Sequence, residues 1–162
     1  MMTNKSVYLK EPSLEELRFT EMLLQDEDTM KFNEKWGGTV PFPKENWEPF
    51  YNAYVKSKDR LYFHIYNLDN QFVGEVSSRF DEYFNSHILN IKVLYRFRGN
   101  CHGYDALVAF LDHFFEDKNH KKISDNVALD NKKGIEVLER IGFKKVFVTS
   151  EYVMMELSRK NY

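Results

Sequence analysis

The order in which the hydrophobic period changes along the chain constrains its fold more than any other feature. Apolar residues recur at helical spacing in 14–24 and 45–56, whereas from residue 61 onward they alternate with polar residues as in strands. Strands are predicted over 6–10, 61–66, 71–80, 87–93 and 121–129, with one or two more in 143–157, and further helices within 98–117 and over 131–141. This order implies an α/β (α+β) fold with one mixed sheet and helices on both faces.

The N-terminal part carries two local signals. Ser13 is followed three residues later by Glu16, which is the spacing of a capping box, so the first helix is predicted to start there. Residues 36–43 read WGGTVPFP, and their two glycines and two prolines predict an ordered aromatic loop without regular structure. Its aromatic side chains can stack on a substrate or can seal the core beneath the loop.

Composition excludes several classes of protein. The 162 residues suit one domain, 1–162, and a net charge of −2 argues against a dedicated nucleic-acid binder. A single cysteine excludes an intramolecular disulfide framework, and no apolar run is long enough for a membrane span. The first residues lack the apolar stretch of a secretory signal. A cytoplasmic protein without membrane or nucleic-acid partners is therefore expected.

The segment 93–107 is the most informative for chemistry. A predicted strand runs into a turn with glycines at 99 and 103, and a helix starts directly behind it. Backbone N–H groups and the positive end of a helix dipole then meet at one point, which is suited to binding a phosphate or pyrophosphate. Arg98 adds a charged donor at the rim. Alternatively, the two glycines serve only to make the turn.

A second segment follows the next strand. Asn131 is a natural N-cap for the helix behind it, and Gly142 is a natural C-terminal stop before Phe143. Both residues can also act purely as helix boundaries.

Together the two segments resemble the GNAT superfamily of acyl-CoA-dependent N-acyltransferases. The cofactor motif of that family, Gln/Arg-x-x-Gly-x-Gly/Ala, reads here RGNCHG from Arg98 to Gly103. The later Asn-x-x-Ala motif reads NKKG from Asn131, and its helix ends at Gly142-Phe143. The resemblance implies a GNAT fold in which the strand ending at Val93 splays from the strand before Asn131, and the acyl-CoA lies in that cleft.

The same resemblance implies the residues that bind the co-substrate, acetyl-CoA. Backbone groups of Ile91 and Val93 would pair with the pantetheine arm, and Asn131 would contact the cofactor near it. The pyrophosphate would lie on the amides of Arg98, Gly99, Asn100, Cys101, His102, Gly103 and Tyr104. No metal is implied, and the cysteine and histidines show no ligand spacing.

Two positions depart from the family pattern. Cys101 stands where the family has its first motif glycine, and Leu138 stands where many members have a tyrosine general acid. The leucine resembles the RimJ/RimL-like and polyamine acetyltransferase branches. Direct transfer in this family needs no covalent enzyme intermediate, so Cys101 is not expected to be a nucleophile.

Three side chains are candidates for the base that takes the proton from the amine. His87 lies eleven residues before Arg98, where the histone acetyltransferase branch has a glutamate, but it can equally be a solvent-facing histidine. Glu75 lies in a hydrophobic strand pattern and can instead form a salt bridge. Asp125 interrupts an apolar face between Ile123 and Val127 and can instead cap a nearby backbone.

These observations predict an N-acetyltransferase that moves acetyl from acetyl-CoA to a primary amine by direct attack. Glu75 and Asp125 would together form an acidic pocket for a peptide N-terminus, a polyamine or another small amine. The alternative is a non-catalytic acyl-CoA sensor or scaffold on the same fold. The family resemblance also suggests a homodimer.

Overall fold

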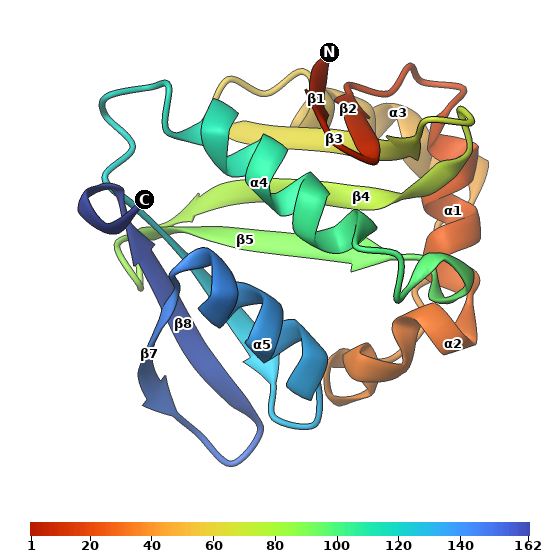
Figure 1. Ribbon diagram of the computed structural model, residues 1–162. Coiled ribbons are helices and arrows are strands. Elements are labelled where there is room, and N and C mark those ends of the chain that lie inside the picture. The colour runs from red at the N-terminus through yellow and green to blue at the C-terminus, as the bar shows by residue number, and fades with distance from the viewer.

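All eight strands of the protein form one sheet, in the order β1-β2-β3-β4-β5-β6-β8-β7 (Figure 1). The computed structural model describes residues 1–162, apart from the side chain of Trp36. Every neighbouring pair is antiparallel except β5 with β6, which is parallel. The strands are β1 (Met2–Asn4), β2 (Val7–Lys10), β3 (Arg60–Asn67), β4 (Phe72–Asp81), β5 (Ser86–Val93), β6 (Lys122–Ala128), β7 (Lys144–Val148) and β8 (Tyr152–Ser158).

Helices cover both faces of this sheet. In Figure 1, α4 crosses in front of the central strands and α5 lies over β6 and β8, whereas α1 and α3 lie on the other side. The helices are α1 (Leu17–Gln25), α2 (Glu27–Met30), α3 (Trp47–Phe50), α4 (His102–Phe114) and α5 (Lys132–Ile141). Short helical segments are η1 (Lys31–Trp36), η2 (Lys44–Asn46), η3 (Tyr51–Val55), η4 (Tyr95–Phe97) and η5 (Arg159–Asn161). The predicted mixed sheet with helices on both faces is confirmed.

The N-terminal half differs in detail from the sequence prediction. The two capping-box bonds are present, since the Ser13 N–H donates to Glu16 at 2.8 Å and the Glu16 N–H donates to the Ser13 hydroxyl at 3.3 Å. The predicted helix start at Ser13 is nevertheless wrong, because residues 14–16 form a turn and α1 begins at Leu17. The single helix predicted over 45–56 is wrong, because that stretch divides into η2, α3 and the π-helical η3. Pro49 in this stretch has no N–H to donate, which removes one bond of a regular helix. Strand β1 was not predicted from the sequence.

The predicted aromatic loop is free of regular structure over 37–43, and the side chain of Trp36 lies outside the described part. Asn33 closes the turn before it, donating from Nδ2 to the Gly38 carbonyl at 2.8 Å. Phe42 in the loop packs with Leu17, Trp47 and Tyr62 in a hydrophobic cluster on the α1 and α3 side of the sheet. This part of the loop therefore seals the core.

The main hydrophobic core lies between the sheet and helices α4 and α5. Fully buried Phe110 and Phe114 of α4 pack there with apolar residues of β2 to β6 and β8. Burying such a side chain contributes about 1.5–3 kcal/mol. This packing fixes α4 against β5 and thereby fixes the turn between them.

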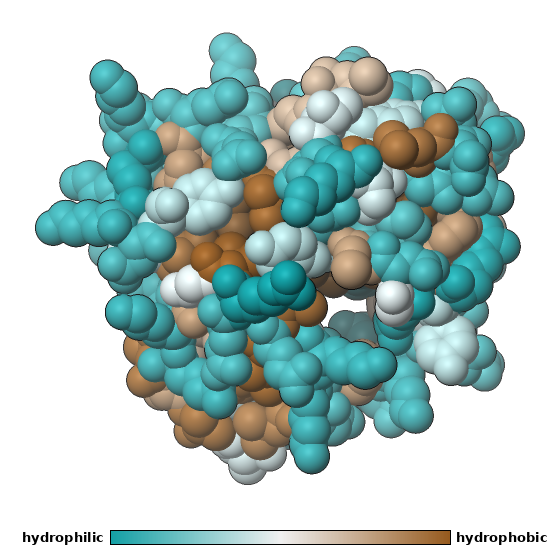
Figure 2. Space-filling view, in the orientation of Figure 1, coloured by the Kyte–Doolittle hydropathy of each residue, from teal (hydrophilic) through white to brown (hydrophobic). Residues whose placement is uncertain are grey.

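Strands β5 and β6 pair only at their first residues and then diverge. The paired positions are His87 with Ile123 and Ile88 with Ser124. Beyond them the strands open as a V whose wide end faces the N-terminus of α4 (Figure 1). Figure 2 shows a hollow in the surface between α2 and the N-terminal end of α5, at this wide end. No helix of the described residues is long and apolar enough to cross a membrane.

Candidate functional site

The open edge of β5 offers backbone groups to the V-shaped cleft. The Leu94 N–H donates to the Val73 carbonyl of β4 at 2.9 Å. Bonding direction alternates along an antiparallel pair. Ile91 and Val93 therefore direct their backbone N–H and C=O groups away from β4, toward the edge of β5 that faces the cleft. The Val93 carbonyl accordingly accepts a bond from outside the β4 pair, from Arg98 Nε at 3.0 Å. An extended ligand chain can therefore pair with β5 at Ile91.

The turn before α4 presents a row of unused N–H donors. In the described part of the chain, no backbone or side-chain acceptor takes the N–H groups of residues 99–104. The next N–H, that of Asp105, donates to the Cys101 carbonyl at 3.0 Å and starts the helix ladder. Free N–H groups and the positive end of the α4 dipole thus converge on one spot, which favours a bound anion.

Arg98 has a structural role that the sequence did not reveal. Its Nε bonds the Val93 carbonyl, and its Nη2 donates to the Thr29 carbonyl of α2 at 2.8 Å. Burial lowers the pKa of the guanidinium, although nearby Asp26 opposes this change. Arg98 therefore ties α2 to the end of β5 and is only partly available to a phosphate.

Cys101 occupies a backbone conformation that side chains avoid. Its φ is 62° and its ψ is 0°, in the left-handed region, and Gly99 has φ 85°. This conformation explains why a glycine suits the position, because an L-residue is strained there. The Cys101 side chain is exposed and makes no cap bond to α4.

His102 and Tyr104 connect the turn to neighbouring elements. Nδ1 of His102 lies 3.1 Å from Oγ of Ser6, and that hydroxyl donates to Oδ2 of buried Asp105 at 2.6 Å. The guanidinium of Arg140 lies 4.8 Å from the Tyr104 ring centroid, which joins α4 to α5. A Cβ added at Gly103, between His102 and Tyr104, would lie 3.5 Å from Cγ2 of Val93 in β5.

Asn131 caps α5 as the sequence predicts. Its Oδ1 accepts the Gly134 N–H at 3.0 Å. Its Nδ2 makes no hydrogen bond within the described residues, so the amide still has a donor available. Leu138 of α5 is buried in the main core and does not face the site.

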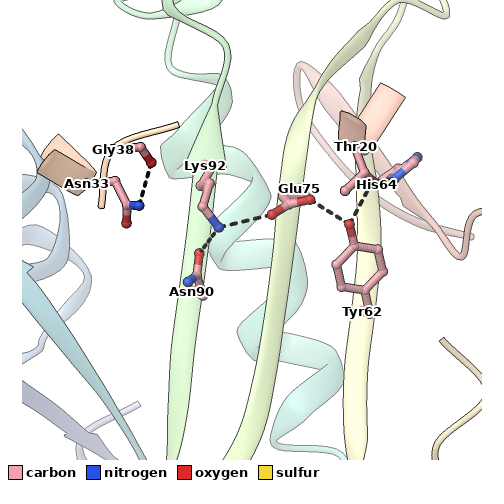
Figure 3. Close-up of polar contacts among 8 residues, drawn as sticks. All are labelled: Thr20, Asn33, Gly38, Tyr62, His64, Glu75, Asn90 and Lys92. Atoms are coloured by element: carbon pink, nitrogen blue, oxygen red, sulfur yellow. Dashed lines mark hydrogen bonds and ion pairs between the residues drawn. The ribbon is translucent and has the colours of Figure 1, made fainter. Parts of the chain in front are cut away.

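A polar network crosses the face of the sheet opposite α4 (Figure 3). Glu75 of β4 receives Lys92 Nζ on Oε1 at 3.0 Å and the Tyr62 hydroxyl on Oε2 at 2.5 Å. Lys92 also donates to Oδ1 of Asn90 at 2.8 Å. The hydroxyl of Thr20 lies 2.9 Å from both Tyr62 Oη and His64 Nε2. The predicted salt bridge of Glu75 is thus present.

This network determines the charge of its members. Burial opposes ionisation of Glu75, but the Lys92 charge and the Tyr62 hydroxyl outweigh it, so the pKa of Glu75 lies below its usual value. Burial lowers the pKa of His64 to about 4, and its Nδ1 has no partner. Glu75 is therefore an ionised and fully paired carboxylate, and His64 is neutral.

A small cavity lies beside the network. Its volume is about 170 Å³, and it is lined by residues of α1, α3, η3 and strands β3 to β5. The lining residues are Thr20, Leu24, Phe50, Tyr54, Tyr62, Glu75, Ser77, Asn90 and Lys92. A larger open hollow of about 580 Å³ lies between α1, α2 and η4, and it contains none of the predicted site residues.

His87 lies away from the other candidates. It sits at the closed end of the V, with its ring 5.0 Å from Phe114 and 4.5 Å from His120. Six residues of strand separate it from Val93, which is about 20 Å. Burial, together with the neighbouring His120, lowers its pKa. The structure does not bring His87 to the open part of the cleft.

Asp125 lies at the vertex of the V. It directly follows the last residue of β6 that pairs with β5, and burial raises its pKa to about 7. It shares a face with Ile123 and Val127, which pack toward α4, whereas Glu75 is on the opposite face. The two carboxylates therefore do not form one acidic pocket, and the partner of Glu75 is Lys92.

Comparisons with known proteins agree with this geometry. A family model described as an acetyltransferase (GNAT) domain matches residues 7–144. A solved spermidine N-acetyltransferase from Vibrio cholerae, in complex with CoA and spermine, is 19% identical with a TM-score of 0.82, covering 98% of this chain and 99% of that chain. A GNAT-family acetyltransferase from Bacillus anthracis is 14% identical with a TM-score of 0.80 and 98% coverage of both chains. No curated protein matches the chain. Within the described residues, no group of three or more acidic, histidine or cysteine side chains is placed to hold a metal.

Proposed function

The chain belongs to the acetyltransferase (GNAT) domain family, and on that basis we propose that it transfers acetyl from acetyl-CoA to a primary amine. The observation that carries the proposal is the free edge of β5 directly before a turn of six unused N–H groups. One linear ligand with a pyrophosphate and an amide-bearing arm matches both features. Acetyl-CoA has this chemistry, and the CoA complex of the Vibrio cholerae relative has the same fold.

Different residues then bind different parts of acetyl-CoA. The N–H groups of Gly99 to Tyr104 hold the pyrophosphate, and Ile91 pairs with the pantetheine arm. Asn131 donates from Nδ2 at the other wall of the cleft. The thioester then lies between β5 and β6, where the side chains of Asn90 and Lys92 open toward the 170 Å³ cavity. We assign this cavity to the acceptor amine.

In the reaction, the amine nitrogen attacks the thioester carbonyl, the C–S bond breaks, and the CoA thiolate leaves. The amine must lose one proton, which Asp125, on the α4 side of the sheet, accepts through water in the cleft between β5 and β6. Its position at the vertex of the V, next to the expected thioester, supports this role, and a pKa of about 7 suits a base at neutral pH. Glu75 is a poorer candidate because both of its oxygens are already bonded.

The proposal is tested by calorimetric titration of the protein with acetyl-CoA. Asn131→Ala removes a side-chain donor, and Gly103→Leu adds bulk beside β5 in the turn that would hold the pyrophosphate. Each variant should therefore weaken binding by about tenfold or more. Circular dichroism of both variants checks that the fold is retained. A folded wild-type protein that binds no acetyl-CoA would refute the proposal.

Turnover is measured separately as thiol release from acetyl-CoA with a panel of primary amines. Binding without release for any amine would favour the acyl-CoA sensor, an alternative that Leu138 supports because it removes the usual tyrosine acid. The Vibrio cholerae relative also has a dodecameric structure, and a homodimer of this chain stays a prediction.

A further inference from the structure

The cavity beside β5 contains one carboxylate and one ammonium among its lining residues, Glu75 and Lys92. Aromatic rings of Phe50, Tyr54 and Tyr62 form much of the remaining wall. Phe50 and Tyr54 stack at 4.4 Å between centroids, so this wall is packed and preorganised. The cavity is therefore apolar on one side and polar but charge-balanced on the other.

The ion pair at its polar side is built into the protein. The Glu75 side chain is only 7% exposed, and Lys92 and Tyr62 each bond one of its two oxygens. Lys92, at 21% exposed, is held in place by Asn90 as well. Tyr62 is fixed in turn by Thr20 (Figure 3). Each oxygen of Glu75 therefore already accepts one hydrogen bond, and its negative charge is balanced by Lys92.

Resting on the proposed function, we infer that Lys92 determines the acceptor class, because it occupies the position beside Glu75 that an acceptor ammonium would otherwise take. The acceptor is a primary amine with a compact apolar or aromatic remainder and no second positive charge. A polyamine carries further ammonium groups, which would meet Lys92 in a partly desolvated site without a free carboxylate.

The size of the cavity agrees with this class. An engineered apolar cavity of about 150 Å³ binds one benzene ring. The cavity here, at about 170 Å³, is large enough for a ring-sized group. Its aromatic wall offers stacking to such a ring.

The experiment compares kcat/KM for phenethylamine and for spermidine, measured as thiol release from acetyl-CoA. The wild-type protein should prefer phenethylamine by about tenfold or more. This ratio is the expected effect of leaving one ammonium of spermidine without a carboxylate partner. Lys92→Met frees the carboxylate, so the ratio should shift toward spermidine by about tenfold or more. Glu75→Gln combined with Lys92→Met leaves no carboxylate and should keep the preference for phenethylamine.

Lys122→Met is the matched control, because it removes a lysine from a surface ion pair with Glu156, of similar length at 3.0 Å. Its ratio should equal that of the wild type. A wild-type preference for spermidine, or a folded Lys92→Met variant with an unchanged ratio, would overturn the inference. If Lys92→Met does not fold, the kcat/KM ratios of the wild type and of the double variant still test the inference. Absence of release with every amine would instead refute the proposed function.

Discussion

Replacing Cys101 by glycine should stabilise the protein, because the backbone there is in the left-handed region. A left-handed conformation costs an L-residue roughly 1–2 kcal/mol, and glycine does not have this cost. Glycine also makes the unfolded chain more flexible, which offsets up to about 1 kcal/mol. The side chain of Cys101 makes no cap bond that would be lost. The free energy of unfolding should therefore rise by about 0.5–1 kcal/mol.

The corresponding change in melting temperature follows from chain length. An unfolding entropy of about 2.1 cal/mol/K per residue gives roughly 0.34 kcal/mol/K for 162 residues, so Tm should rise by about 1.5–3 °C. Urea unfolding followed by tryptophan fluorescence, in reducing buffer, measures the free energy directly. Acetyl-CoA binding should be retained, since the N–H at position 101 stays in place.

Cys101→Ala is the matched control for this prediction. It removes the thiol but keeps the Cβ, so the left-handed strain remains and no gain is expected. Equal stabilisation by alanine and glycine would show that the thiol, and not the backbone conformation, is responsible. No gain with glycine would refute the assignment of strain to this residue.

Three other predictions concern pH, close packing and the link between β5 and α2. Burial raises the pKa of Asp125 to about 7, so kcat/KM should increase as pH rises through 7. Asp125→Asn should lose this increase and should be about 100-fold less active. The folded state holds the Asp125 proton more tightly than the unfolded state does. The free energy of unfolding should therefore decrease as pH rises from about 4 to 7 in the wild type, but not in Asp125→Asn. Gly74→Ala would place a Cβ 2.0 Å from a carbonyl oxygen of β5 and should cost about 1–3 kcal/mol in urea unfolding, whereas Gly103→Ala meets its nearest neighbour at 3.5 Å and should cost little. Arg98→Met removes bonds to carbonyls of β5 and α2, so amide hydrogen exchange in 26–32 should become faster.

Much of the fold is predictable because its signals are local. Strand alternation and the cap at Asn131 depend on neighbouring residues, and both are confirmed. The bonds between Ser13 and Glu16 are also present, although α1 begins only at Leu17. The helix predicted over 45–56 is wrong because apolar spacing does not report the missing N–H of Pro49 or the change to π-helical bonding after Phe50. Strand β1 was missed because three residues carry too little periodicity.

The placement of the site candidates depends on contacts between distant segments. His87 has the expected spacing to Arg98. The point at which β5 separates from β6, however, depends on packing across the sheet. Arg98 matches its motif, yet its bond to Thr29 spans 69 residues and no local pattern reports it. Spacing alone therefore identified the turn that precedes α4 but not which polar groups share a cavity.

The relation between Glu75, Lys92 and Asp125 shows why this limit matters for function. Alternation assigns each residue a face within its own strand, but whether two strands present the same face depends on register, and a shift by one residue exchanges the faces. The hairpin register puts Lys92 directly opposite Glu75, while the β5 to β6 register puts Asp125 on the α4 side. A sequence reading that joins two acids predicts a pocket for polycations. The register instead pairs the ionised Glu75 with Lys92 on one face and leaves a separate acid at the vertex. Under the proposed function, the turn motif would therefore select the cofactor and cross-strand pairing would select the acceptor.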